Sequence, residues 1–153
     1  LRQSVRLGQH FALRKLKFDA VVTGSLRRHA QTWAGIAQGG DFQTNALVWP
    51  GLNEYDGEAV ITAIAPKPLE RPTTPELYRE HFRMLRDGLT QWMNGVVSPK
   101  GMPSYREFQH GVTSALEHVR KNCEGNVLIV SSGGPISTAV GHVLGTMPEG
   151  SDR

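Results

Sequence analysis

The chain has 153 residues, of which 39% are hydrophobic and 20% charged, a balance typical of one soluble globular domain with a single core. Its formal charge is +3 at pH 7, but its 17 lysines and arginines are scattered, which argues against a nucleic-acid-binding tail. No stretch reaches the roughly 20 apolar residues of a membrane-spanning helix, and the single cysteine cannot form an internal disulfide. We therefore expect a cytoplasmic protein that binds neither nucleic acid nor membrane.

Short apolar runs alternate with amphipathic segments in the first half of the chain. Residues 1–17 predict a helix, residues 18–23 a short buried strand, and residues 27–37 a second helix that Gly39-Gly40-Asp41 should end. Residues 47–49 predict another strand, stopped by a Pro-Gly pair, whereas residues 52–72 predict mostly irregular structure.

The second half predicts three helices and the clearest strand. One helix should cover residues 75–94, after a capping threonine, and another should begin at Ser104 and end near Asn122. Four consecutive apolar residues, Val127–Val130, predict a central parallel strand covered on both faces, and residues 136–144 predict a last helix. This alternation predicts an α/β fold, a three-layer α/β/α sandwich with a mostly parallel sheet.

The segment from Val127 to Gly145 carries the strongest functional signal. Its strand runs through Ser-Ser-Gly-Gly-Pro into a helix, which places free backbone N–H groups and a positive helix end at the strand's carboxyl edge. Gly133 and Gly134 would let a ligand approach the backbone closely. The segment therefore suits an anion, although a tight connection without any ligand has the same pattern.

Two further positions lie just after predicted strands. Arg27 or Arg28, in the first turn of the helix after residues 18–23, could hold phosphate oxygens with a planar guanidinium, or the pair could simply be a solvated helix end. Glu54, which follows the second strand, could act as a general acid beside a phosphate, or could be a surface acid. None of the six histidines pairs at metal-ligand spacing, so we predict no metal and no cofactor.

Together these segments resemble the histidine phosphatases, also called the phosphoglycerate mutase-like superfamily. Residues Ser25–Thr32 are similar to its Ser-Pro-Leu-x-Arg-Ala-x-x-Thr motif, in which the arginine stands four residues before the threonine, at Arg28. Leu52-Asn53-Glu54 is similar to the segment that supplies an acidic residue. Val130–Ile136 resembles the closing motif Val-Ser-His-Gly-Gly-x-Ile.

The resemblance implies a phosphoryl-transfer enzyme, first of all a phosphomonoesterase with a phosphohistidine intermediate and a small phosphorylated substrate. It implies that Arg28, Ser132 and Gly133 bind phosphate, that Ser132 also serves catalysis, and that Glu54 protonates the leaving group. It also implies one domain over residues 1–153, with a lid or insertion at residues 47–100. The sequence does not fix the substrate or the oligomeric state.

The chain departs from the family pattern in two places. The nucleophilic histidine belongs to an Arg-His-Gly strand end, which we expect upstream of Leu1, in a domain whose N-terminal strand and C-terminal end lie outside this chain; His29 is expected only as a neighbour of the site. Ser132 stands where the family has its second histidine, and a hydroxyl brings no positive charge. Three alternatives therefore stay open: a catalytically weak phosphate-binding or regulatory protein, a phosphoglycerate mutase-type enzyme, and an unrelated α/β domain.

Overall fold

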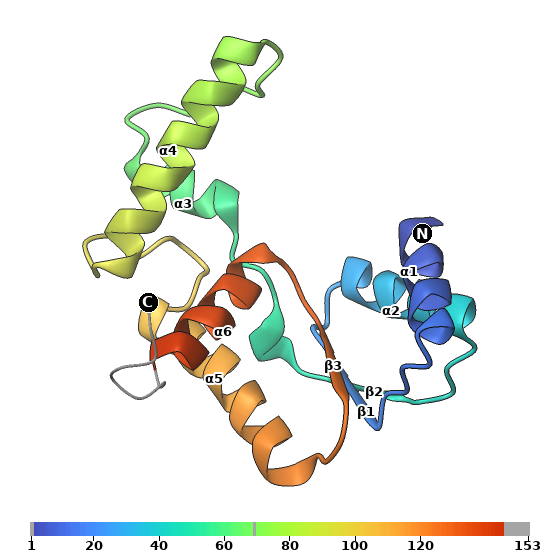
Figure 1. Ribbon diagram of the computed structural model, residues 1–153. Helices are drawn as coiled ribbons and strands as arrows, with labels where there is room; N and C mark the ends of the chain where they lie inside the picture. Colours follow the sequence, from blue (N-terminus) through green and yellow to red (C-terminus); the bar gives the residue numbers. More distant parts are fainter. Residues whose placement is uncertain (1, 69, 146–153) are drawn as a thin grey trace. The chain divides into compact units, whose positions relative to one another are not determined.

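A computed structural model describes residues 2–68 and 70–145 of the chain (Figure 1). Its elements follow the order α1 (Arg2–Leu13), β1 (Ala20–Thr23), α2 (Arg27–Gly40), β2 (Ala46–Val48), the 3-10 turn η1 (Pro50–Leu52), α3 (Gly57–Ile64), α4 (Pro75–Met93), α5 (Tyr105–Asn122), β3 (Val127–Val130) and α6 (Gly133–Gly145). None of the helices in the described ranges is long and apolar enough to cross a membrane.

The chain forms two compact units. The first, here called the sheet unit, takes in the chain up to Glu54 and again from His110; the second, the helical unit, runs from Tyr55 to Gln109. All three strands belong to the sheet unit.

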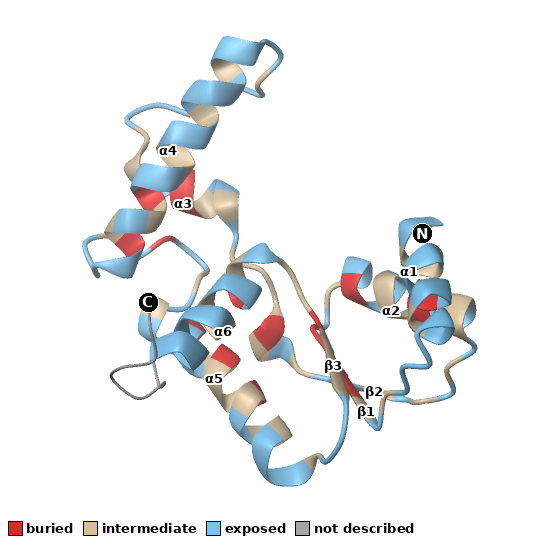
Figure 2. Ribbon diagram, in the orientation of Figure 1, coloured by how far each residue is buried: buried red, intermediate tan, exposed pale blue. Residues whose placement is uncertain are grey.

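The three strands form a parallel sheet in the order β2-β1-β3. β1 is its middle strand, and Figure 2 shows buried residues in it. Val21 and Val22 are each only 1% exposed. The prediction of a central strand at Val127–Val130 was therefore wrong for the described residues, where β3 pairs with β1 alone. A run of apolar residues indicates burial by helices, but it does not tell an edge strand from a central one.

Helices α1 and α2 lie together on one side of the sheet (Figure 1). They approach so closely that a Cβ atom on Gly8 would lie 2.1 Å from the Ile36 carbonyl oxygen, and one on Gly39 only 1.9 Å from that of Val5. The predicted end at residue 37 was too early, because packing against α1 holds both Gly39 and Gly40 in the helix. The predicted break at Gly39-Gly40-Asp41 is right only at its last residue: α2 ends at Gly40, and Asp41, whose φ of 55° is left-handed, is its C-cap.

Helices α5 and α6 lie on the opposite side of the sheet. There Val22, Leu52 and Ala115 form a buried cluster, which brings β1, η1 and α5 together. Partly buried side chains extend it: Trp49, Val119, Val127 and Ile129. The sheet between two layers of helices confirms the predicted α/β/α fold class.

The helical unit contains a helix that the sequence analysis missed. Residues 52–72 were expected to be mostly irregular, yet α3 covers eight of them, capped by the Asp56 side chain, which accepts from the Ala59 N–H at 3.1 Å. α3 packs on α4 at Gly88, where a Cβ would lie 2.7 Å from Val60 Cγ1. The predicted helix at residues 75–94 is confirmed as α4, with Thr74 accepting from the Leu77 N–H at 3.2 Å.

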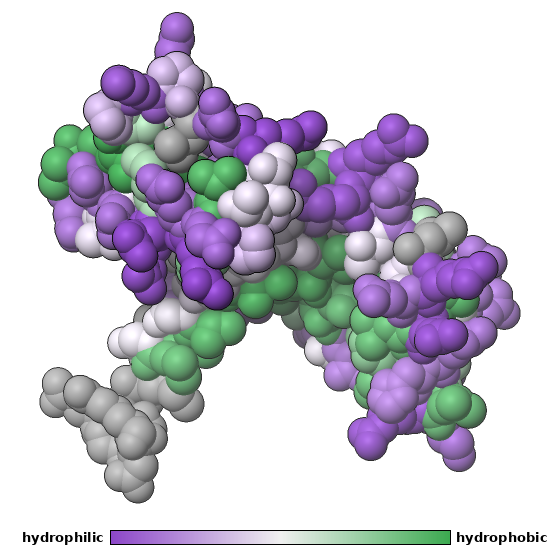
Figure 3. All heavy atoms as spheres, turned by 90° about the horizontal axis from the view of Figure 1, so that it is seen from above, coloured by the Kyte–Doolittle hydropathy of each residue, from purple (hydrophilic) through white to green (hydrophobic). Residues whose placement is uncertain are grey.

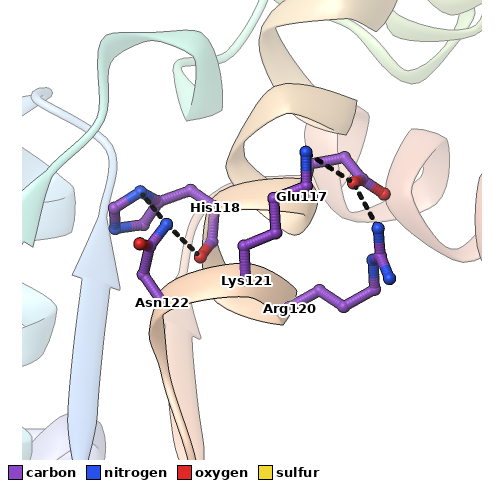
Figure 4. Close-up of polar contacts among 5 residues, drawn as sticks. All are labelled: Glu117, His118, Arg120, Lys121 and Asn122. Carbon is purple, nitrogen blue, oxygen red and sulfur yellow. Dashed lines mark hydrogen bonds and ion pairs between the residues drawn. The ribbon is translucent and has the colours of Figure 1, made fainter.

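The surface of the sheet unit carries exposed ion pairs and exposed apolar side chains. At the end of α5, Glu117 pairs with Arg120 at 2.9 Å and with Lys121 at 3.9 Å (Figure 4). Such exposed pairs add little stability. Figure 3 shows hydrophobic patches among hydrophilic ones on the outside of the molecule. α6 contributes four exposed apolar residues: Ile136, Val140, Val143 and Leu144.

Candidate functional site

The carboxyl ends of the three strands meet at one edge of the sheet, because the strands are parallel. Asn53, in the segment after β2, accepts from the Ser25 N–H at 2.7 Å and donates from Nδ2 to Ser25 Oγ at 2.7 Å. Ser131, directly after β3, donates to the Leu52 carbonyl oxygen at 2.7 Å. These hydrogen bonds tie the three strand ends together and fix the segment that leads to Glu54.

Ser132 is the meeting point of the site. Arg28, exposed in the first turn of α2, donates from both Nε and Nη2 to Ser132 Oγ, each at 3.3 Å. His29 Nε2 lies 2.6 Å from the same oxygen. The structure thus brings together Arg28 and Ser132, which are 104 positions apart in the chain. This geometry does not fit an unrelated α/β domain, for which we would expect the two side chains to lie out of reach of each other.

His29 is almost completely buried, with 2% of its surface exposed. Its Nδ1 has no hydrogen-bond partner within the described part of the chain and faces Gly24, where a Cβ would lie only 2.2 Å away. Burial, and next the positive charge of Arg28, lower the pKa of the His29 imidazole below its usual 6.5, while the Glu54 carboxylate opposes that shift. The ring is therefore neutral at pH 7.

Glu54 reaches the start of α6. Its Oε2 accepts from the Gly134 N–H at 3.1 Å. One of the backbone N–H groups that were predicted to be free for an anion is thus already bonded to a carboxylate of the chain itself. Gly133 is different: apart from its chain neighbours and the backbone of its own helix, no described atom lies within 4 Å of the place that a Cβ on it would take. A ligand could reach the backbone there without displacing a side chain.

The four predicted site residues therefore lie on the sheet unit, at the strand edge and the start of α6. An exposed guanidinium, a hydroxyl, a neutral imidazole and a carboxylate are gathered there, and these groups can hold an anion and exchange a proton. Within residues 2–68 and 70–145, no three metal-ligating side chains gather.

Two residues were missed by the sequence analysis or given too small a part. Asn53 was quoted only as a motif neighbour of Glu54, although its place directly after a strand could have marked it as a bridge. His29 was expected beside the site, but its contact with Ser132 was not predicted. Its position could have predicted this contact. The first turn of a helix that follows a strand lies over the edge of the sheet, where a side chain can be buried.

Comparison with known proteins places these features in a family. A family model described as the histidine phosphatase superfamily (branch 1) matches residues 1–153. Among solved structures, the α-ribazole phosphatase from Shigella flexneri has a TM-score of 0.62 and 19% identity, covering 97% of this chain and 68% of its own. The phosphoglycerate mutase from Bacillus anthracis str. Sterne has a TM-score of 0.56 and 17% identity, covering 91% and 65%.

These two similarities show the fold, and the chain spans about two thirds of the length of each structure. No curated protein matches the chain.

Proposed function

Because this chain belongs to the histidine phosphatase superfamily, we propose that it is a phosphomonoesterase that acts on a small phosphorylated substrate through a phosphohistidine. The observation that supports the proposal best is the meeting of Arg28 and Ser132 at the carboxyl edge of a parallel sheet. Ligands of open α/β sheets bind at this edge.

In this proposal Arg28 and Ser132 bind the phosphoryl group. The guanidinium offers two N–H groups side by side, a geometry that matches two phosphate oxygens and that lysine cannot reproduce. The Ser132 hydroxyl donates to a third oxygen. Gly133 leaves the start of α6 open, where the helix dipole favours a negative charge.

Glu54 supplies the proton transfers. As the bond between phosphorus and the leaving oxygen breaks, the carboxylic acid protonates that oxygen, and the phosphoryl group moves to a histidine nitrogen. We place that histidine upstream of Leu1, because the printed sequence contains no Arg-His-Gly segment. Water then attacks the phosphohistidine, Glu54 takes the proton of the water, and inorganic phosphate leaves.

Ser132 also favours a second candidate, a phosphate-binding or regulatory protein that keeps the fold but turns over slowly. A serine in place of histidine brings no positive charge to offset charge on the phosphoryl oxygens. A mutase, the activity named for the Bacillus structure, would use the same groups with a different acceptor. The lid at residues 47–100 stays a prediction.

Hydrolysis of p-nitrophenyl phosphate by the purified full-length protein, with the segment upstream of Leu1 included, tests the proposal. Arg28→Ala should lower kcat/KM by about 100-fold or more, the usual effect of removing a donor that stabilises charge in the transition state. Arg27→Ala removes an equal charge from the same exposed helix turn and should leave kcat/KM within about twofold, as most surface changes do.

Two other results would count against the enzyme. Binding of inorganic phosphate without turnover would favour the regulatory candidate. A wild-type protein that neither binds phosphate nor hydrolyses the ester would reject both functions.

A further inference from the structure

We propose that His29 is a positioning residue for Ser132: its Nε2–H donates to the serine hydroxyl and thereby directs the hydroxyl proton toward a phosphoryl oxygen. The inference rests on the proposed function, since it assigns a task within the phosphate site. It begins with the shortest contact of the site, the 2.6 Å between His29 Nε2 and Ser132 Oγ.

The buried ring itself indicates which nitrogen carries the proton. His29 Nδ1 is buried and meets no acceptor in the described part of the chain, and it faces the backbone of Gly24. A buried N–H without an acceptor is rarer in proteins than an unsatisfied acceptor. A neutral ring therefore keeps its proton on Nε2, where Ser132 Oγ accepts it.

The neutral state of the ring agrees with its surroundings. The charged groups acting on it are Arg28, from its own helix, and Glu54, from the segment after β2. Burial and the charge of Arg28 outweigh the effect of Glu54 and lower the pKa of His29. The imidazole is therefore not doubly protonated, and Nδ1 does not carry a buried N–H without an acceptor.

Among residues 2–68 and 70–145, the hydrogen-bond partners of Ser132 Oγ are then all donors. Arg28 donates to its oxygen from two nitrogens, which can never accept, and His29 donates from a third direction. A hydroxyl has one proton and two lone pairs, so the lone pairs face Arg28 and His29 and the proton points away from both. The same donors polarise the O–H bond and strengthen the hydrogen bond that it gives.

The arrangement also connects the departure at Ser132 with a second difference from the quoted motifs, at His29. In those motifs alanine follows the arginine and histidine stands at the position of Ser132, whereas here a histidine follows Arg28 and a serine stands at 132. An imidazole is thus supplied to the site from the carboxyl end of the neighbouring parallel strand, β1, and it acts on phosphate through the serine hydroxyl.

A double-mutant cycle on the purified full-length protein tests the inference. His29→Leu keeps the side-chain volume but removes the donor, Ser132→Ala removes the hydroxyl, and a third variant combines the two. Each single change should lower kcat/KM for p-nitrophenyl phosphate about tenfold, the effect of losing one hydrogen bond of roughly 1.4 kcal/mol. The combined variant should be no slower than Ser132→Ala alone, because His29 acts only through the serine.

His29→Gln is the matched control, because its amide can place an N–H near the former Nε2. It should recover most of the rate lost in His29→Leu and should bind inorganic phosphate almost as the wild type does. Additive losses in the combined variant, or a glutamine variant as slow as the leucine variant, would overturn the inference. An unchanged rate in His29→Leu, beside a large loss in Arg28→Ala, would overturn it while leaving the proposed function standing.

A measurement that needs no turnover separates the two proposals further. Nitrogen-15 NMR of the histidine ring should show the Nε2–H tautomer, and Ser132→Ala should shift its resonances. An Nδ1–H tautomer would reject the inference even in an active enzyme. If the wild type proves inactive, the proposed function fails, and the tautomer still decides whether His29 orients Ser132.

Discussion

Replacing Gly24 by alanine should damage the site through a single methyl group. The new Cβ would lie 2.2 Å from His29 Nδ1 and 2.9 Å from Asn53 Oδ1, whereas ordinary contacts begin at about 3.4 Å. The imidazole is buried and held at Ser132, so it cannot turn aside without giving up the 2.6 Å contact. The variant must therefore move the ring, and with it the hydroxyl that the ring holds.

The size of the effect follows from two terms. Overpacking a buried site costs roughly 1–3 kcal/mol, and losing one hydrogen bond costs about 1 kcal/mol more. The free energy of unfolding should thus fall by about 2–4 kcal/mol, seen as a melting temperature lower by roughly 4–16 °C for a chain of this size.

Urea unfolding followed by circular dichroism measures this loss. Gly141→Ala is the matched control, because its new methyl group would meet no described atom within 4 Å outside its own helix, and alanine in a helix is favoured over glycine by about 1 kcal/mol. A Gly24→Ala protein as stable as the wild type would refute the crowding at His29 on which the reasoning depends.

Three other changes have defined outcomes. Glu54→Gln should slow hydrolysis of an alkyl phosphate far more than that of p-nitrophenyl phosphate, whose leaving group needs little protonation; equal losses in kcat would contradict a general acid. The pKa of His29 is lowered in the folded state, so as the pH falls the unfolded chain binds a proton at this histidine before the folded chain does. The stability that this group contributes should therefore be complete above pH 6.5 and should be lost as the pH falls below it. His29→Gln should flatten that part of the urea-midpoint profile, and an equally steep variant would assign it to another group. Asp56→Ala should destabilise the protein by about 0.5–2 kcal/mol through loss of the α3 cap, and an unchanged urea midpoint would show that the cap contributes nothing.

Local signals in the sequence were enough for most of the fold. The strand at residues 127–130 and the caps at Thr74 and Ser104 depend on neighbouring residues alone, and the structure has them where they were predicted. The helix through Gly39-Gly40 depends instead on a distant partner, α1, which a propensity argument does not contain. The same limit applies to β3, whose place at the edge depends on strand pairing.

The candidate site shows the same division. Motif spacing selected Arg28 rather than Arg27; the structure brings Arg28 to Ser132, and its role in binding phosphate stays a prediction. Spacing could not predict that Glu54 would accept from the Gly134 N–H, or that His29 would turn inward over Gly24. Both depend on how three strand ends pack against one another, so they follow from the tertiary structure.

The parallel pairing of β1 with β3 has a consequence for the order of folding. β1 and β2 are joined by one helix, but β3 reaches β1 only after the intervening hundred or so residues have closed into a loop, and long loops close at an entropic cost. A chain in which only β1 and β2 have paired has Arg28 at the edge of the sheet, but Ser132 is not yet beside it. Under the proposed function, phosphate bound by Arg28 and Ser132 would therefore stabilise only the state in which β1 has paired with β3, and so the complete sheet.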